Sequence, residues 1–370
     1  MPAFDIPNPD SEPIQPHDFL PSASLETLQQ RAELLAEVRR HFHAGGYWEV
    51  ETPLLSQEVI IDAHLEPFAI LEPALEMSQS VDGFDSGKAP LFLQTSPEAA
   101  MKRLLVTGAT AVFQITRALR RGEFGPYHNP EFTMVEWYRT GDTHNNQMDV
   151  VEELVRAVFQ RAAELREAGS GGRESRGSVG RFAVEPPFDR MTYDEAFERW
   201  TGIRVLDLGP KPLSELGRKH GVAPPESLRA DDRDGWLNLL LAELVEPHLG
   251  QQRPVFLFDY PASQAALARI RDGDPPVAER FELYADGIEL CNGYHELTDV
   301  QELRKRMRRQ SQIRAEHGLR PLPEPARLLA AIQAGLPACA GVALGFDRLA
   351  MLALGKGSLA EVLAFPFDRA

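Results

Sequence analysis

The strands expected in this 370-residue chain come in local runs and do not alternate regularly with helices. Segments typical of strands lie at residues 47–53, 91–94, 112–115, 131–138, 254–260, 281–290 and 341–344. A parallel sheet needs a crossover connection, usually a helix, between its strands. The order of the segments therefore favours an antiparallel sheet flanked by helices, which is an α+β fold.

Apolar residues repeat at helical spacing in the segments that would flank this sheet. In the first of them, Leu28, Leu35 and Val38 fall on one face of a helix predicted over 25–44. Further helices are predicted from about residue 96, over 148–167, as short pieces within 190–250, and over 299–317, 347–354 and 359–363. No internal repeat is visible, so we expect one mixed domain and not a repeat array.

The composition limits the classes of function and the compartment. The chain has 39 basic and 55 acidic residues, a net charge of −16, which counts against a protein that coats nucleic acid. Its two cysteines, Cys291 and Cys339, are too few for a disulfide framework or a four-thiolate zinc site. No run reaches the roughly 18 apolar residues of a membrane span. We therefore expect a cytoplasmic protein that does not enter a membrane.

A charged turn separates two strand-like stretches between Arg117 and Arg139. Arg120 and Arg121 lie before the turn, and Phe132 lies after it. Guanidinium groups suit phosphate oxygens, and an aromatic face suits a nucleotide base. The segment predicts a long hairpin with features of a nucleotide site, although taken alone it is more simply an exposed charged hairpin.

Two carboxylates and an amide lie among apolar residues at 287–297, namely Glu289, Asn292 and Glu296. Oxygen ligands of this kind suit magnesium, which usually takes one or two carboxylates together with substrate phosphates. A regular strand would put Glu289 and Glu296 on opposite faces, and a bulge at Gly293 would bring them to one side. A set of cross-strand salt bridges is the alternative explanation.

The segment 341–352 is an apolar, glycine-containing strand that runs into a helix. Asp347 is a candidate N-cap of that helix. Arg348 falls in the first turn, where the helix dipole disfavours a cation, so its position is better explained if it meets an anion such as phosphate. A solvated arginine is the simpler alternative.

In this order and at these separations, the three segments resemble motifs 2 and 3 of the class II aminoacyl-tRNA synthetases. The helix at 25–44 with Glu51–Pro53 resembles motif 1. The resemblance is carried most specifically by Phe258–Gln264, Tyr127–Met134 and Asn292–Leu297, and it extends from residue 25 to residue 370. It is strongest for the lysine branch, and within it for the lysyl-tRNA synthetase paralogues that attach (R)-β-lysine to elongation factor P.

The resemblance implies a class II catalytic domain that activates an amino acid with ATP and magnesium. Arg120 would hold the α-phosphate and Arg348 the γ-phosphate, so these two are the expected catalytic residues. Phe132 would lie under the adenine. The other expected ATP contacts are Glu123, His128, Asn129, Glu289, Leu290 and Gly345. Glu289 and Glu296 are the expected magnesium ligands.

One position departs from the family pattern in motif 2. The family reads Arg-x-Glu from the phosphate-binding arginine, whereas this chain reads Arg120-Arg121-Gly122-Glu123, with the acid one place later. Glu123 reaches the site if the turn reshapes around Gly122. If it does not, a weakly active, regulatory adenylate-binding module becomes an alternative to the enzyme.

The same resemblance implies a pocket for a lysine-like substrate that carries two ammonium groups. The expected pocket residues are Ser96, Glu98, Glu136, Tyr138, Asn292, Glu296 and Ala343. Several carboxylates are needed because an unpaired buried charge is costly. Lysyl-tRNA synthetases have glycine at the place of Ala343. One methyl group there is worth roughly 1–3 kcal/mol of discrimination, which favours β-lysine over α-lysine.

The predicted organisation is a proline-rich arm over 1–24 and one catalytic domain over 25–370, with a flexible insertion near 168–181. Lysyl-tRNA synthetases place an anticodon-binding domain before the catalytic domain, and the arm is too short to form one. Together with the negative charge, this makes tRNA an unlikely partner and favours elongation factor P as acceptor. The motif 1 resemblance implies a homodimer. A truncated lysyl-tRNA synthetase-like ligase with another acceptor stays an alternative.

Overall fold

The computed structural model describes residues 19–70, 90–169 and 182–370. The predicted arm up to residue 18 and nearly all of the predicted insertion near 168–181 lie outside these ranges. The division of the chain into an arm and a catalytic domain stays a prediction. Within the described ranges, no helix is both long enough and apolar enough to cross a membrane.

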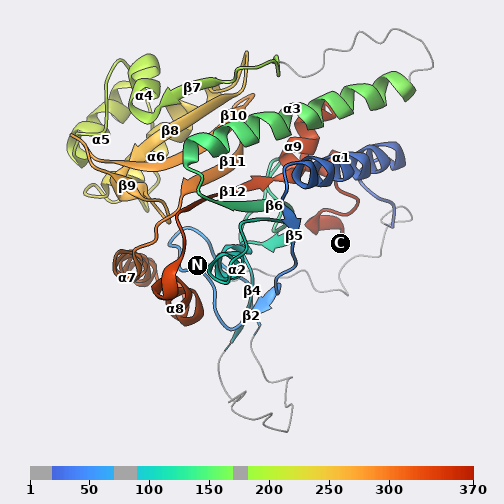
Figure 1. Cartoon of the computed structure of the whole chain (residues 1–370). Helices are drawn as coiled ribbons and strands as arrows, with labels where there is room; N and C mark the ends of the chain where they lie inside the picture. Colours follow the sequence, from blue (N-terminus) through green and yellow to red (C-terminus); the bar gives the residue numbers. More distant parts are fainter. Residues whose placement is uncertain (1–18, 71–89, 170–181) are drawn as a thin grey trace, which may run out of the picture.

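A nine-stranded sheet forms the centre of the described molecule (Figure 1). In spatial order its strands are β1 (Trp48–Glu49), β5 (Ala111–Leu119), β6 (Glu131–Thr140), β12 (Cys339–Gly345), β11 (Ile288–His295), β10 (Val277–Ala285), β8 (Val255–Pro261) and β7 (Asp189–Thr192), with β9 (Ile270–Arg271) beside β10. The β1–β5 and β7–β8 pairs at the two edges are parallel, and the other pairs of this sheet are antiparallel. The predicted antiparallel sheet in an α+β fold is therefore confirmed.

Helices cover one face of the sheet and border the other (Figure 1). The helices of the covered face are α1 (Leu25–Ala44), α3 (His144–Gly169) and α9 (Phe346–Ala353), and they share one apolar core with the central strands. The helices of the other side are α2 (Glu98–Val106), α7 (Val300–Glu316) and α8 (Ala326–Gly335). They form a smaller core with Tyr138 of β6 and Cys339 of β12.

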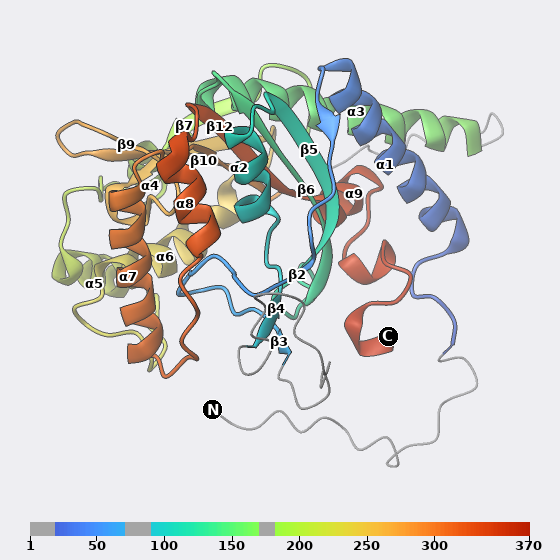
Figure 2. The same ribbon diagram turned by 60° about the horizontal axis from the view of Figure 1, so that its bottom comes forward.

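A third group of helices packs at the β8–β7 end of the sheet (Figure 1). It contains α4 (Tyr193–Thr201), α5 (Pro210–Lys219) and α6 (Arg233–Leu244), with the short 3-10 helices η1 (Glu246–His248) and η2 (Ala262–Gln264) nearby. A small second sheet, visible at the bottom of Figure 2, is formed by β2 (Leu55–Ser56), β4 (Leu91–Leu93) and β3 (Ala69–Ile70). The predicted short helices within 190–250 are confirmed.

Local sequence explains why α1 has the predicted bounds. The side chain of Ser24 accepts a hydrogen bond from the amide of Thr27, which caps the first turn. Leu34, Val38 and Phe42 are buried on one face of the helix. The predicted helix is confirmed, and Val38 of the predicted face is buried, whereas Leu28 and Leu35 are only half-buried, so the face that packs on the sheet is turned slightly from the predicted one.

The strand predicted over 281–290 is wrong in its extent. The structure has two antiparallel strands there, β10 and β11, joined by Asp286 and Gly287. Both joining residues have positive φ, 52° and 73°, the conformation that a two-residue hairpin turn of this kind requires. The sequence Asp-Gly is the signal for that turn, and it divides the segment into the ends of two strands.

Asp347 does not cap α9, because Gly345 occupies the N-cap position. The Asp347 side chain is buried instead, where it accepts a hydrogen bond from the amide of Thr133 at 2.8 Å and forms an ion pair with Arg31. One carboxylate therefore ties α1, β6 and α9 together.

The carboxyl-terminal segment is fastened to the turn between β5 and β6. Leu359 is the first residue of the 3-10 helix η3 (Leu359–Glu361), and its amide donates a hydrogen bond to the carbonyl of Pro126 at 2.9 Å. At η4 (Phe367–Arg369), the amide of Phe367 donates to Asn129 Oδ1 at 2.9 Å. The rings of Phe367 and Phe124 also meet edge to face. The last residues of the chain thus hold the hairpin turn in place.

We predict that Asp347→Ala lowers the free energy of unfolding by about 3 kcal/mol, because it leaves the Arg31 guanidinium and the Thr133 amide without their partner. Arg39→Ala removes the exposed ion pair between Arg39 and Glu49 and should cost less than about 1 kcal/mol. Urea unfolding of both variants measures the difference. Equal effects would contradict a special role for the buried pair.

Candidate active site

One large cavity, of about 830 Å³, opens on the face of β6, β12 and β11 that α3 does not cover. Every residue that the sequence predicted for the site lines this single cavity. These residues are Ser96, Glu98, Arg120, Glu123, His128, Asn129, Phe132, Glu136, Tyr138, Glu289, Leu290, Asn292, Glu296, Ala343, Gly345 and Arg348. The structure therefore brings together positions that lie up to 252 residues apart, while the role of each residue stays a prediction.

The floor of the cavity depends on small residues in β12. Ala343 pairs with Glu136 of β6 on one side and with Asn292 of β11 on the other. Gly341 lies in the same way between Tyr138 and Tyr294. A Cβ atom on Gly341 would lie 2.2 Å from the Tyr138 ring, so only glycine allows this ring to cross the strand.

At one end of the cavity, an arginine lies over an aromatic ring. The Arg120 guanidinium carbon is 5.0 Å from the centre of the Phe132 ring. Gly122 has φ +89°, and the turn around it brings Glu123 to within 3.6 Å of Arg120. Glu123 lines the cavity, so the condition set by the sequence is met, and the later position of the acid does not remove it from the cavity.

Arg348 joins the β5–β6 turn to β11 at the same end. It donates to the carbonyl of Tyr127 at 3.0 Å and to the carbonyl of Glu289 at 2.9 Å, and its third nitrogen lies 2.7 Å from His128 Nε2. Burial and the Arg348 charge lower the pKa of His128, so its neutral ring accepts this contact. Asn129, which is fastened to Phe367, completes the turn. Two guanidinium groups thus line this end of the cavity, each within 3.7 Å of a carboxylate, Glu123 for Arg120 and Glu289 for Arg348.

Glu289 and Glu296 both face the cavity, but the predicted bulge at Gly293 is wrong. The pairing of β11 with β12 is regular from Cys291 to His295, and the shift lies between Leu283 and Tyr284 of β10, which pair with Cys291 and Glu289. Leu290 is therefore the extra residue of a β-bulge in β11. The bulge reverses the alternation of side chains along the strand, so that Glu289 and Glu296 face the same side of the sheet. The bulge has the predicted consequence and occurs three residues earlier.

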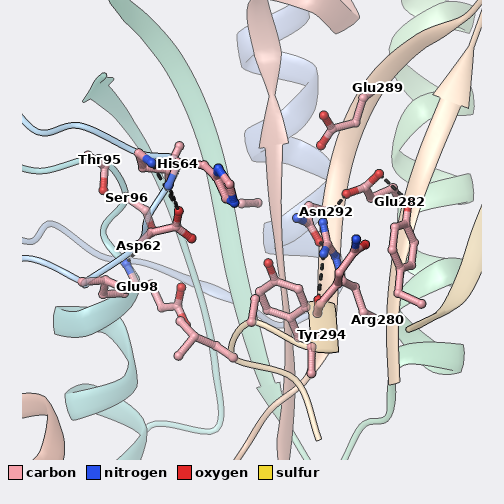
Figure 3. A pocket seen from close by; sticks show the side chains of 18 of the residues that line it. Asp62, His64, Thr95, Ser96, Glu98, Arg280, Glu282, Glu289, Asn292 and Tyr294 are labelled. Carbon is pink, nitrogen blue, oxygen red and sulfur yellow. Dashed lines mark hydrogen bonds and ion pairs between the residues drawn. The ribbon is translucent and has the colours of Figure 1, made fainter. Parts of the chain in front are cut away.

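Glu289 lies beside a second carboxylate that the sequence analysis missed (Figure 3). Burial and the neighbouring Glu282 raise the pKa of Glu289 to about 7. Glu282 accepts hydrogen bonds from Tyr260 at 2.5 Å and Tyr284 at 2.6 Å, and it pairs with Arg280. A cation between the two carboxylates would relieve their repulsion, and the oxygen donors suit magnesium.

Arg280 was also missed, although it lines the cavity. Its guanidinium lies 4.4 Å from the centre of the Tyr260 ring and donates to Asn292 Oδ1 at 3.3 Å. Because that oxygen is the acceptor, the amide nitrogen of Asn292 is left to face the cavity (Figure 3). Nothing in the spacing along the chain distinguishes Arg280 from the other basic residues near it.

Three carboxylates crowd the opposite end of the cavity. Glu98, Glu136 and Glu296 are all buried. Glu136 accepts hydrogen bonds from Ser96 at 2.8 Å and from Tyr138 at 2.6 Å, and neither donor carries a charge. Burial and the nearby Glu98 raise the pKa of Glu136 to about 7. This end of the cavity therefore attracts cations.

A buried lysine, which the sequence analysis missed, stands between two of these carboxylates. Lys102 Nζ is 2.5 Å from Glu98 Oε1 and 2.5 Å from Glu296 Oε2. Burial alone would lower the pKa of Lys102, but the two carboxylates outweigh it and raise that pKa. The available signal was a lysine four residues after a glutamate on one helix face.

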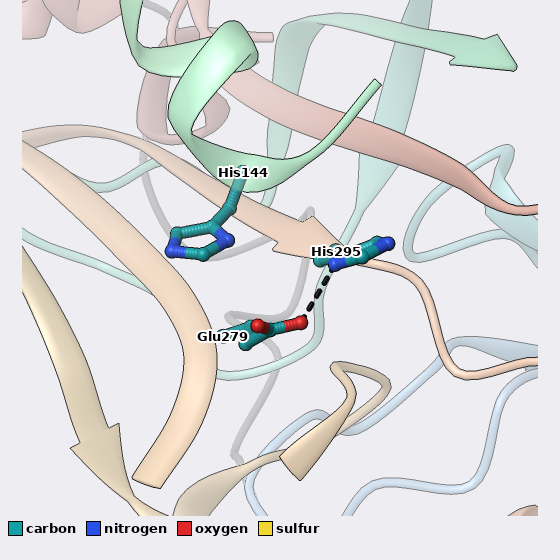
Figure 4. Close-up of side chains that lie close together, drawn as sticks. All are labelled: His144, Glu279 and His295. Atoms are coloured by element: carbon teal, nitrogen blue, oxygen red, sulfur yellow. Dashed lines mark hydrogen bonds and ion pairs between the residues drawn. The ribbon is translucent and has the colours of Figure 1, made fainter. Parts of the chain in front are cut away.

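A separate cluster of His144, Glu279 and His295 lies on the α3 side of the sheet (Figure 4). Its ligand atoms lie within 4.8 Å of one another. His295 Nδ1 is 2.6 Å from Glu279, and its Nε2 is 3.3 Å from the guanidinium of Arg269. Since Arg269 would repel a divalent cation, we read the cluster as a structural link between the start of α3 and the end of β11.

This antiparallel sheet, with arginines and an aromatic ring at one end of its cavity and carboxylates at the other, defines the class II aminoacyl-tRNA synthetase type of catalytic domain. The chain belongs to the class II tRNA synthetase family of the D, K and N enzymes, whose family model matches residues 17–369. The predicted family is therefore confirmed.

Curated relatives extend this match over nearly the whole chain. A Vibrio cholerae protein is 42% identical over 356 residues, which cover 95% of this chain and 99% of the relative. A Vibrio vulnificus protein is 41% identical and a Salmonella typhimurium protein 42% identical, each over 353 residues, 95% of this chain and 98% of the relative. All three are named elongation factor P–(R)-β-lysine ligase. The chain is thus similar to the ligase branch that the sequence motifs indicated.

We predict that Gly341→Ala lowers the free energy of unfolding by about 2 kcal/mol, because its Cβ would collide with the Tyr138 ring and lie 2.8 Å from Glu296 Oε1. Gly345→Ala is the matched control on the same strand. Its Cβ meets nothing closer than 3.8 Å, and its cost should stay below about 1 kcal/mol. Thermal unfolding of both variants measures the difference, and an equal loss would contradict the close approach.

Proposed function

We propose that this chain is an ATP-dependent ligase that activates (R)-β-lysine as its adenylate and transfers it to a lysine side chain of elongation factor P. The observation that carries the proposal is the arrangement of charged groups in the large cavity, in a chain 41–42% identical to ligases of that name over 95% of its length. Cationic groups at one end suit a triphosphate, and carboxylates at the other suit ammonium groups.

In the first step, a carboxylate oxygen of β-lysine attacks the α-phosphorus of ATP. A carboxyl-phosphate bond forms, and pyrophosphate leaves with the electron pair of the broken bond. Arg120 and Arg348 would stabilise the negative charge on the phosphate oxygens, and Phe132 would stack with the adenine. Glu123, His128, Asn129, Leu290 and Gly345 would contact the nucleotide around them. No protein nucleophile is needed.

Magnesium, when bound, neutralises phosphate charge during this step. Of the two carboxylates predicted to hold it, Glu289 is the better supported, because a second carboxylate, Glu282, lies beside it and raises its pKa, while Arg348 is 3.7 Å away. Glu296 already pairs with Lys102, which favours its other predicted role in the amino-acid pocket. Glu289 and Glu282 are therefore the carboxylates that we propose for magnesium.

In the second step, the uncharged amine of the acceptor lysine attacks the acyl carbon of the adenylate. An amide bond forms, AMP leaves, and the amine loses a proton. Glu98, Glu136 and Glu296 would hold the two ammonium groups of the bound acyl part, with Ser96, Tyr138 and Asn292 completing the pocket. Ala343 on the floor would favour the β-amino position.

We propose further that the protein works as a homodimer and does not use tRNA as acceptor. β1 is an edge strand that pairs with β5, and Trp48 in it is 59% exposed, as expected for a surface that a second copy would cover. The proposal is consistent with the motif 1 resemblance of α1 and the segment around Pro53. Sedimentation velocity of the whole chain measures the oligomeric state.

The first test is ATP–pyrophosphate exchange with purified protein. We expect exchange with (R)-β-lysine to exceed exchange with α-lysine by about tenfold or more, since one methyl group in a pocket discriminates by roughly 1–3 kcal/mol. Mass spectrometry of elongation factor P after the full reaction should then locate the added acyl group on one lysine.

The outcomes separate the candidate functions. Exchange without modification of elongation factor P would favour a ligase with another acceptor. No exchange with any lysine isomer would favour the regulatory adenylate-binding module and overturn the proposal. Arg120→Ala serves as the inactive reference and should reduce the exchange rate by about 100-fold or more.

The pKa of Glu136 predicts a pH dependence of amino-acid binding. At pH 6 a carboxyl group with a pKa of about 7 is mostly protonated, and at pH 8 it is mostly ionised and attracts the substrate ammonium. We expect the KM for (R)-β-lysine to be about tenfold higher at pH 6 than at pH 8, while the KM for ATP changes little. Glu136→Gln should bind (R)-β-lysine more weakly and lose part of this dependence, and the remainder belongs to Glu296, whose pKa burial raises to about 8. A variant that keeps all of it would show that another group titrates.

A further inference from the structure

A buried cation stands behind the wall of the amino-acid end of the cavity, against two of the carboxylates that line it. Lys102 is 2% exposed. Its ammonium contacts Glu98, which lies one turn earlier in α2, and Glu296, which follows β11. A buried lysine is costly unless it is paired, so its position between two carboxylates requires a reason beyond the packing of α2. Its ammonium also lies 6.0 Å from the centre of the Tyr138 ring, which adds a weak attraction.

Lys102 forms both an ion pair and a hydrogen bond with Glu98, but with Glu296 it forms an ion pair alone. It donates a hydrogen bond to Glu98 Oε1. Glu296 Oε2 lies as close in distance, yet this buried oxygen accepts no hydrogen bond within the described part of the chain. The ion pair to Glu296 is thus present in charge, although its geometry falls outside that of a well-aligned hydrogen bond.

Three buried carboxylates and one buried ammonium meet at this end of the cavity. Glu98, Glu136 and Glu296 carry three negative charges when ionised, and Lys102 behind them cancels one of these charges. Two remain, which equals the number of ammonium groups on a diamino acid. An acid with one ammonium group would leave a buried carboxylate unpaired, at a large cost.

We propose that Lys102 is a positioning residue that fixes Glu98 and Glu296 and sets the charge of the pocket, so that the site selects an acid with two ammonium groups. This inference rests on the proposed amino-acid activation and concerns its substrate selectivity. Lys102 does not touch the reacting atoms. It acts through the two carboxylates, and a substrate ammonium completes the hydrogen bonding of Glu296 that Lys102 leaves open.

Chemical rescue tests the proposal with the full chain. In ATP–pyrophosphate exchange, Lys102→Ala should raise the KM for (R)-β-lysine by about tenfold or more, with the KM for ATP within about twofold. Propylammonium added to Lys102→Ala can occupy the vacated space, and it should restore a large part of the loss in a saturable way. Lys102→Met keeps most of the side-chain volume without the charge, so it should show the same loss and no rescue.

Two controls complete the design. Lys219→Ala, at the exposed end of α5 and away from the cavity, should match the unchanged protein with and without propylammonium. In the unchanged protein, propylammonium should have no effect or should compete with the amino acid. Norleucine, which has one ammonium group, should remain a much poorer substrate than α-lysine for the unchanged protein.

The results distinguish a failure of the proposed function from a failure of the positioning role of Lys102. If the unchanged protein shows no exchange, the proposed function fails. If it does show exchange and Lys102→Ala has an unchanged or lower KM for the amino acid, then Lys102 is not a positioning residue. A loss that affects both KM values, with a lower melting temperature and no response to propylammonium, would show a merely structural role and would also overturn the inference.

Discussion

The small side chains of β12 are the constraint on which the rest of the site depends. This strand crosses the middle of the cavity floor with Gly341, Ala343 and Gly345 in alternate positions, so its neighbours supply the large polar groups. Tyr138 can cross over Gly341 only because no Cβ is there. The register of the antiparallel pairs then places Glu136 and Asn292 on either side of Ala343. Backbone geometry thus sets the width of the pocket before any charged group is considered.

The cavity separates opposite charges along its length, although the chain as a whole is strongly acidic. Arg120 and Arg348 stand at the end near the β5–β6 turn, and the buried cluster of Glu98, Glu136 and Glu296 stands at the other end. A substrate with a cationic side chain and a phosphate-bound carboxyl group would be oriented by this field. Net charge therefore says little about whether a protein binds phosphate, because low-dielectric surroundings make local charges decisive.

The sequence predicted the elements with strong local signals and missed those set by tertiary contacts. The apolar spacing of α1 and the two strands of the β5–β6 hairpin were clear in the sequence. The site residues expected from the motifs all line one cavity in the structure. The bulge occurs at Leu290 and not at Gly293 because the register of β10 decides it. Lys102 and Arg280 were missed because charge compensation is decided by neighbours in space, and α8 was missed because its pattern is short.

The fastening of the last residues to the β5–β6 turn has a consequence for how the protein is made. Leu359 and Phe367 hold Pro126 and Asn129, which are synthesised more than 200 residues earlier. On the ribosome, the hairpin can pair with itself long before its anchors emerge. The nucleotide end of the site is then completed only when residues 359–367 have emerged. An incomplete chain would carry the carboxylate end of the pocket without a finished place for ATP, so truncated products are expected to be inert and not partly active.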